Sequence, residues 1–147
     1  MKQTKLYIIS AILILIGILT FSSCKKNTDS ATIELTQKMI QDKTWFLTYR
    51  VTNGTVKSYL GEPSYFINFL KNKTTKDSDG LEGTYMIKIE NNQLQVALQI
   101  KLPNQTSFDY QYDYQYDIDL IGESNLVFSY TPINTTDRIK LYFTLNK

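Results

Sequence analysis

Between Trp45 and Leu145 apolar residues recur at every second position, and short turn sequences interrupt this pattern. Asn53-Gly54 and Asn91-Asn92 are typical of the two-residue turns that join adjacent antiparallel strands, since both turn positions tolerate positive φ. A period of two places alternate side chains on opposite faces of a strand. We therefore expect short strands with one apolar face each, at residues 45–52, 56–60, 65–69, 73–76, 85–90, 93–100, 108–120, 126–130 and 139–145.

The connections between these strands are too short to contain a crossover helix, which favours an antiparallel sandwich or barrel built as a meander. A meander of eight or nine strands closes most simply into an up-and-down barrel, because closure removes the exposed strand edges. Before the first strand, apolar residues at helical spacing predict a helix from Ile33 to Asp42, with Thr32 as its cap. The predicted fold class is all-β: an antiparallel up-and-down barrel of about eight strands with a short N-terminal helix.

The first 24 residues have the organisation of a bacterial export signal. A basic start with Lys2 and Lys5 precedes an apolar run from Leu6 to Phe21, and two serines then precede Cys24, the only cysteine of the chain. This arrangement resembles the lipobox of bacterial lipoproteins, in which the cysteine becomes the mature N-terminus and carries acyl chains such as palmitate. The alternative is an uncleaved membrane helix, but the run has 16 residues, and a helix needs about 20 to span a bilayer.

The lipobox resemblance implies a signal peptide at residues 1–23, a polar tether at residues 24–31 and a folded domain at residues 32–147. It also implies a protein held by lipid at Cys24 in the cell envelope of a Gram-negative bacterium. Because no acidic cluster follows Cys24 directly, we expect the outer membrane, with the domain facing the periplasm. Asp29-Ser30-Ala31 resembles an O-glycosylation motif of one bacterial lineage, which makes Ser30 a candidate glycan acceptor.

Charge and composition argue against several function classes. The chain has 16 basic and 14 acidic residues, and loss of Lys2 and Lys5 with the signal would leave a net charge of zero. No basic patch therefore points to nucleic acid. The absence of histidine excludes His-based catalytic triads and Cys/His zinc sites. We expect no enzymatic activity, no metal and no cofactor.

The lipobox, the helix and the strand openings at residues 44–48, 65–69 and 77–85 together resemble the small lipocalin-like lipoproteins of Gram-negative bacteria. The resemblance covers most of residues 40–147. It implies a barrel that binds a small apolar or amphipathic ligand. We also expect Trp45 to be buried at one end of that barrel.

The segment from Phe108 to Leu120 alternates for 13 residues without a break. One face carries the candidate ligand-binding residues Tyr110, Tyr112, Tyr114 and Tyr116, and the other carries Asp109, Asp113 and Asp117. The tyrosines fit three interpretations: a packed core, a wall that lines a ligand, or an exposed surface that contacts a glycan or protein. Successive aspartates of the row lie about 13 Å apart on a strand, too far to share a calcium ion, so a solvated face is favoured.

Two functions are consistent with these features. The first is a membrane-anchored barrel that encloses a small ligand, and the second is an interaction module with a filled core, such as an inhibitor or an accessory subunit. The volume of the barrel interior discriminates between them, because a void of a few hundred Å³ is needed to hold a ligand.

Overall fold

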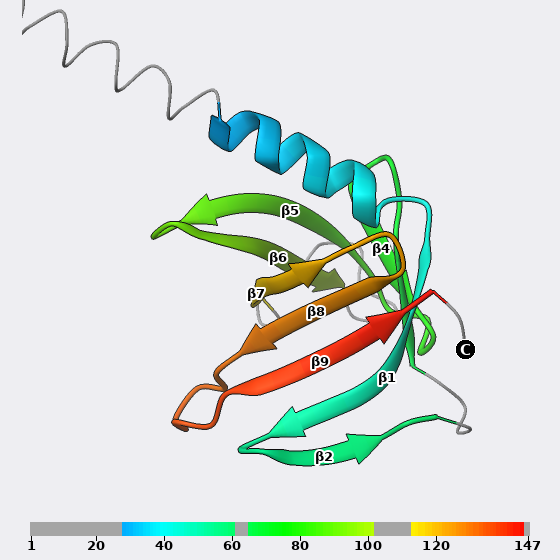
Figure 1. The fold of residues 1–147 in the computed structure, drawn as a ribbon. Helices are drawn as coiled ribbons and strands as arrows, with labels where there is room; N and C mark the ends of the chain where they lie inside the picture. Colours follow the sequence, from blue (N-terminus) through cyan, green and yellow to red (C-terminus); the bar gives the residue numbers. More distant parts are fainter. Residues whose placement is uncertain (1–27, 61–64, 102–112, 146–147) are drawn as a thin grey trace, which may run out of the picture. The chain divides into compact units, whose positions relative to one another are not determined.

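The computed structural model describes residues 28–60, 65–101 and 113–145. The chain forms two compact units, Met1–Glu34 and Leu35–Lys147. A helix occupies residues 28–40, and nine strands follow it (Figure 1). The strands are β1 (Thr44–Thr52), β2 (Thr55–Ser58), β3 (Phe66–Phe69), β4 (Thr74–Asp77), β5 (Glu82–Glu90), β6 (Gln93–Lys101), β7 (Asp113–Ile121), β8 (Asn125–Tyr130) and β9 (Ile139–Thr144).

Eight strands form a closed antiparallel barrel in the order β1, β3, β4, β5, β6, β7, β8 and β9. The barrel closes because β1 also pairs with β9, with Phe46 opposite Thr144 and Thr52 opposite Ile139. The remaining strand, β2, pairs with the C-terminal half of β1, beyond the segment that pairs with β3. The predicted up-and-down barrel is therefore confirmed.

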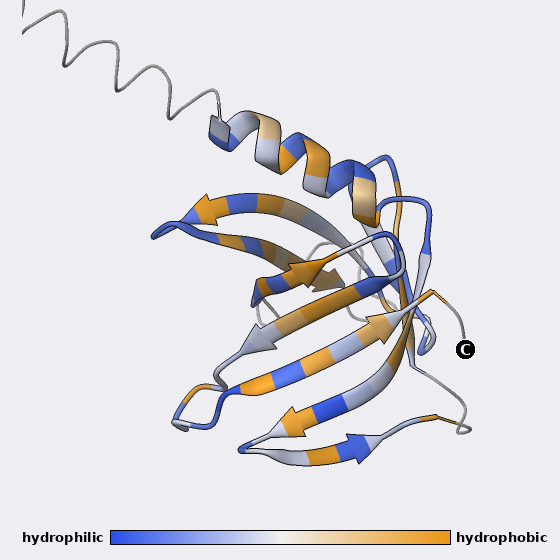
Figure 2. Cartoon of the chain, viewed as in Figure 1, coloured by the Kyte–Doolittle hydropathy of each residue, from blue (hydrophilic) through white to orange (hydrophobic). Residues whose placement is uncertain are grey.

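Both predicted two-residue turns are present. Asn53 and Gly54 have φ values of 49° and 80°, and Asn91 and Asn92 have values of 51° and 61°. These are left-handed conformations, which glycine and asparagine adopt more easily than other residues. Polar and apolar residues alternate along the strands that the turns connect (Figure 2), as a barrel with a packed interior requires.

The helix starts earlier than predicted. It is already formed at Thr28, the first described residue, so it includes residues 28–31, which were assigned to the tether. The prediction of Thr32 as the cap was wrong, because the Thr32 hydroxyl donates to the Thr28 carbonyl one turn earlier, at 2.9 Å. After the helix, Asp42 takes a left-handed φ of 56°, and its amide donates to the Phe69 carbonyl at 2.8 Å.

One end of the barrel, here called the helix end, is covered by residues 35–42. Ile40 and Trp45 are fully buried, and the Trp45 indole N–H donates to the Ile40 carbonyl at 3.0 Å. The Gln41 amide donates to the Tyr85 hydroxyl at 2.8 Å. The predicted burial of Trp45 at one end of the barrel is confirmed. The opposite end, here called the far end, carries the Asn53–Gly54 turn and the connections at residues 78–81 and 131–138.

β7 does not alternate without a break. Its pairing with β8 shifts by one residue between Ile118 and Leu120, so Asp119 is an extra residue in the strand. Such a β-bulge reverses the faces of the residues that follow it. Leu120 is accordingly 50% exposed, while Ile118 is buried. The prediction that both residues share the aromatic face was wrong for Leu120.

Gly83 lies where β5 approaches β6 too closely for a side chain. A Cβ at this position would overlap the backbone carbonyl of Gln99, whereas a Cβ at Gly122 would make only an ordinary contact at 3.8 Å. We predict that Gly83→Ala lowers the free energy of unfolding by about 1–3 kcal/mol, since the backbone has to shift. Gly122→Ala is the matched control and should change it little. Equal denaturation midpoints for the two variants would contradict the prediction.

Candidate functional site

The tyrosine strand faces the barrel interior. Tyr114 and Tyr116 pair with Leu98 and Val96, which are both buried. Their rings stack with centroids 6.0 Å apart, and Tyr116 also stacks on Phe128 at 5.7 Å. Tyr116 is half-buried, and Tyr114 is 40% exposed. Tyr110 and Tyr112 lie outside the described residues.

Burial keeps two interior phenols neutral. Burial is the main cause that raises the pKa of Tyr116, and the neighbouring Tyr130 and Tyr114 add to it. Burial also raises the pKa of Tyr65, together with the carboxylate of Asp77, to which the Tyr65 hydroxyl donates at 3.3 Å. Both phenols therefore keep their protons at neutral pH: Tyr116 is a packing group, and Tyr65 also donates a hydrogen bond.

The interior is nearly filled. Phe69 packs edge-on against Tyr85 and Phe128, at centroid distances of 5.1 and 6.2 Å, and Phe128 packs against Phe143 at 5.6 Å. Among the described residues, a pocket between the interior side chains has a volume of about 40 Å³, far below the few hundred Å³ that a small-molecule ligand needs. It is lined by Tyr65, Ile67, Leu98, Tyr116, Phe128, Leu141 and Phe143.

A larger groove lies on the outer face of β5, β6 and β7. Met86, Ala97 and Gln115 are aligned across the three strands, and they alternate with residues that face inward. Because Ala97 is small and its neighbours are larger, the surface is hollowed there, with a volume of about 310 Å³. Lys88 and Gln99 also border this groove, and Met86 is 56% exposed.

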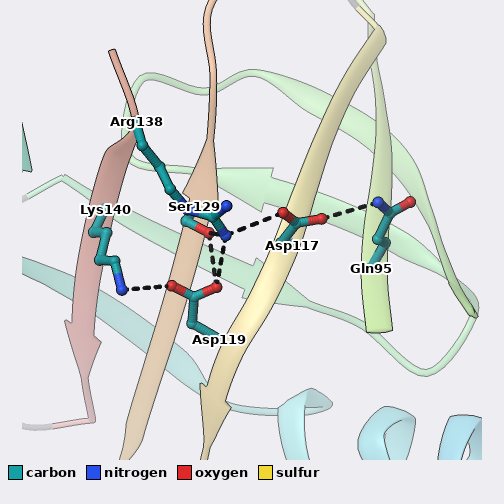
Figure 3. A network of polar contacts seen from close by, with 6 residues as sticks. All are labelled: Gln95, Asp117, Asp119, Ser129, Arg138 and Lys140. Carbon is teal, nitrogen blue, oxygen red and sulfur yellow. Dashed lines mark hydrogen bonds and ion pairs between the residues drawn. The ribbon is translucent and has the colours of Figure 1, made fainter. Parts of the chain in front are cut away.

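Next to the groove, a polar network crosses the outer face from β6 to β9 (Figure 3). The Gln95 amide donates to Asp117 at 2.9 Å, and the Arg138 guanidinium contacts Asp117 and Asp119 at 3.2 Å each. Ser129 donates to Asp119 at 2.8 Å, and the Lys140 ammonium lies 2.9 Å from the same carboxylate. Asp117 was predicted to be solvated, yet its side chain is only 24% exposed and is bonded on both sides.

The network lowers the pKa of Asp119. Burial alone would raise it, but hydrogen bonds from Lys140 and Ser129 and the positive charges of Lys140 and Arg138 outweigh that effect. Alternation places Asp119 on the same face as Asp117, but the spacing along the chain does not show that Ser129 and Lys140 lie across from them, because that alignment depends on the register of β7, β8 and β9. The two carboxylates, Asp117 and Asp119, are neutralised by the two cations, Arg138 and Lys140. The network therefore links neighbouring strands and leaves no unpaired charge within it.

Two cations occupy a different position, near the far end. Arg50 of β1 lies opposite Lys57 of β2 on one side and opposite Leu141 of β9 on the other. Within the described residues, neither Arg50 nor Lys57 forms an ion pair. Sequence analysis did not single out these residues, because their pairing depends on the register of β2.

The other predicted site residues are Cys24 and Ser30. Cys24 lies outside the described residues, and Ser30 is exposed on the helix. Within the described ranges, no three acidic side chains gather in a way that could hold a metal ion. In the same part of the chain, no helix combines the length and apolar character needed to cross a membrane.

No protein-family model matches the chain, and no curated protein matches its sequence significantly.

The Asp119 network should stabilise the fold in a pH-dependent way. Because the folded-state pKa is below the unfolded value, its contribution is complete above about pH 4 and is lost as the pH falls through the lower folded value. We predict that Asp119→Asn lowers the free energy of unfolding by about 1 kcal/mol at pH 7, and by less at high salt. Glu123→Gln, which removes an exposed charge, is the control. A loss for Asp119→Asn that stays constant down to pH 2 would contradict this origin.

Proposed function

We propose that this chain is a lipid-anchored protein of the bacterial envelope that acts through its surface, as an interaction module for a protein or a glycan. The supporting observation is the volume of about 40 Å³ between the interior side chains. Pockets that bind small molecules typically measure about 300–1,000 Å³. A ligand inside this barrel would have to displace packed aromatic rings, and this argues for a filled core.

A second candidate function is the binding of a small amphipathic molecule, and the outer groove favours it. Its volume of about 310 Å³ reaches the range of ligand pockets. Met86 offers apolar surface, while Lys88 and Gln99 offer polar groups that could orient a ligand. The same surface also has the mixed character of a protein interface, since methionine and tyrosine are enriched in such interfaces.

The attachment to the membrane is proposed from the lipobox at Cys24. The lipid places the domain at the bacterial outer membrane, with its surface in the periplasm. We further propose that the protein has no enzymatic activity, needs no cofactor and does not bind nucleic acid. These proposals rest on the absence of histidine and on the net charge after signal removal.

Attachment can be tested by fatty-acid labelling in a Gram-negative host. We predict that the wild-type protein incorporates labelled palmitate and partitions into membranes, and that Cys24→Ala does neither. Ser30→Ala is the control and should keep the label. Equal labelling of Cys24→Ala and wild-type protein would refute lipid attachment at this residue.

A filled interior can be tested with an engineered void. We predict that benzene, an apolar probe of the interior, leaves the melting temperature of the wild-type protein unchanged. Leu141→Ala should lose about 2–4 kcal/mol of stability, because it enlarges the interior pocket. Benzene should then raise the melting temperature of this variant, as it occupies the new void. A clear rise for the wild-type protein would favour an enclosed ligand over a surface function.

A further inference from the structure

Arg50 and Lys57 lie on the same face of the β1–β2 hairpin. They are directly opposite in the register, and Arg50 is also aligned with Leu141, which borders the interior pocket. Aligned residues of antiparallel strands project to the same side. Both cations are therefore on the face of the sheet that continues the barrel interior towards the far end.

This pair lacks a counter-charge in the described part of the chain. Like charges directly opposite each other destabilise a pair of strands. The Lys57 ammonium lies 4.9 Å from the centre of the Tyr59 ring, which supplies only a weak attraction. Asp137, a carboxylate near the hairpin, accepts a hydrogen bond from Asn53 at 2.7 Å. Arg50 as a whole residue is half-buried.

We propose that Arg50 and Lys57 bind an oxyanion, a phosphate or carboxylate group, at the far end of the barrel. The planar guanidinium of arginine binds two oxygens of such a group at once, and lysine adds a point charge. Thr52 lies two residues after Arg50 on the same face of β1, opposite Ile139. A bound anion would remove the repulsion between the two cations.

The filled interior limits the kinds of molecule to which the anionic group can belong. The interior pocket that Leu141, the residue aligned with Arg50, helps to line measures about 40 Å³, which is too small for an apolar ligand. The group is therefore either a free ion or the headgroup of a lipid that stays outside. This inference rests on the proposed surface function, since it names the chemistry that one part of the surface recognises.

The test is a titration of the full acylated chain in neutral detergent at constant ionic strength. Binding is monitored by the NMR chemical shifts of the Arg50 side chain and of the amides of residues 49–58. The probes are inorganic phosphate, acetate, and micelles that contain phosphatidylglycerol or, as a neutral control, phosphatidylcholine. Binding of phosphate or acetate supports a free ion. Binding of phosphatidylglycerol alone supports a headgroup.

We expect Arg50→Gln to weaken anion binding about tenfold or more, as loss of a two-oxygen contact does. Lys57→Gln should weaken binding less, and Lys76→Gln, which removes an exposed charge on β4, should leave it unchanged. Equal losses in all three variants would indicate general charge attraction and overturn the proposal. So would the absence of any shift with every probe.

A thermal melt separates anion binding from a structural role. In anion-free buffer Arg50→Gln should melt no lower than the wild-type protein, because it removes a like-charge contact. Phosphate or phosphatidylglycerol should raise the melting temperature of the wild-type protein and not of the variant. A variant that melts lower in anion-free buffer would make Arg50 structural and overturn the proposal. If no anion binds in the titration, this inference is overturned. If benzene also leaves the melting temperature of the wild-type protein unchanged, the proposed surface function still holds.

Discussion

The pairing of β1 with β9 determines the rest of the architecture. These strands lie at opposite ends of the meander, and their contact turns an open sheet into a ring without an unpaired edge between them. Closure forces one face of every barrel strand inward. The inward positions of β1 then run from Trp45 at the helix end, through Leu47, to Arg50 towards the far end. One strand therefore carries both the buried anchor and the candidate anion-binding residue.

Closure also requires the strands to bend, and two bulges provide the bend. In β1 the pairing with β9 shifts between Leu47 and Tyr49, and the Thr48 hydroxyl donates to the Tyr142 carbonyl at 2.9 Å. In β7 the pairing with β8 shifts at Asp119, and Lys140 and Ser129 bind the carboxylate of this residue on the outer face. The polar network on the surface therefore includes the bulged residue of β7.

The sequence was sufficient for the features that depend on local chemistry. The period of two, together with Asn53-Gly54 and Asn91-Asn92, predicted the strands, their order and the closure, because turn geometry and one-sided burial act over a few residues. The bulges could not be predicted, since an extra residue in a strand depends on its partner across the sheet. Strand register also determines that Arg50 lies opposite Lys57. It likewise brings Asp117 within hydrogen-bonding distance of Gln95 and Arg138. Neither arrangement can be predicted from spacing along the chain. The helix start was missed because Thr32 binds its own backbone instead of capping the helix.

The filled interior and the proposed anchor lead to one physical consequence. A module that works through its surface needs little affinity for a membrane-bound partner, because a lipid at Cys24 confines it near the bilayer and raises the effective concentration of both molecules. The helix includes Thr28, so at most residues 24–27 separate it from the proposed lipid, and four residues span at most about 14 Å. A weak contact, such as a single oxyanion held by Arg50 and Lys57, is then sufficient to bias how the domain meets its partner. The tyrosines serve this function indirectly, since Tyr116 and Tyr65 help to fill the interior and keep the barrel rigid beneath the residues that make the contact.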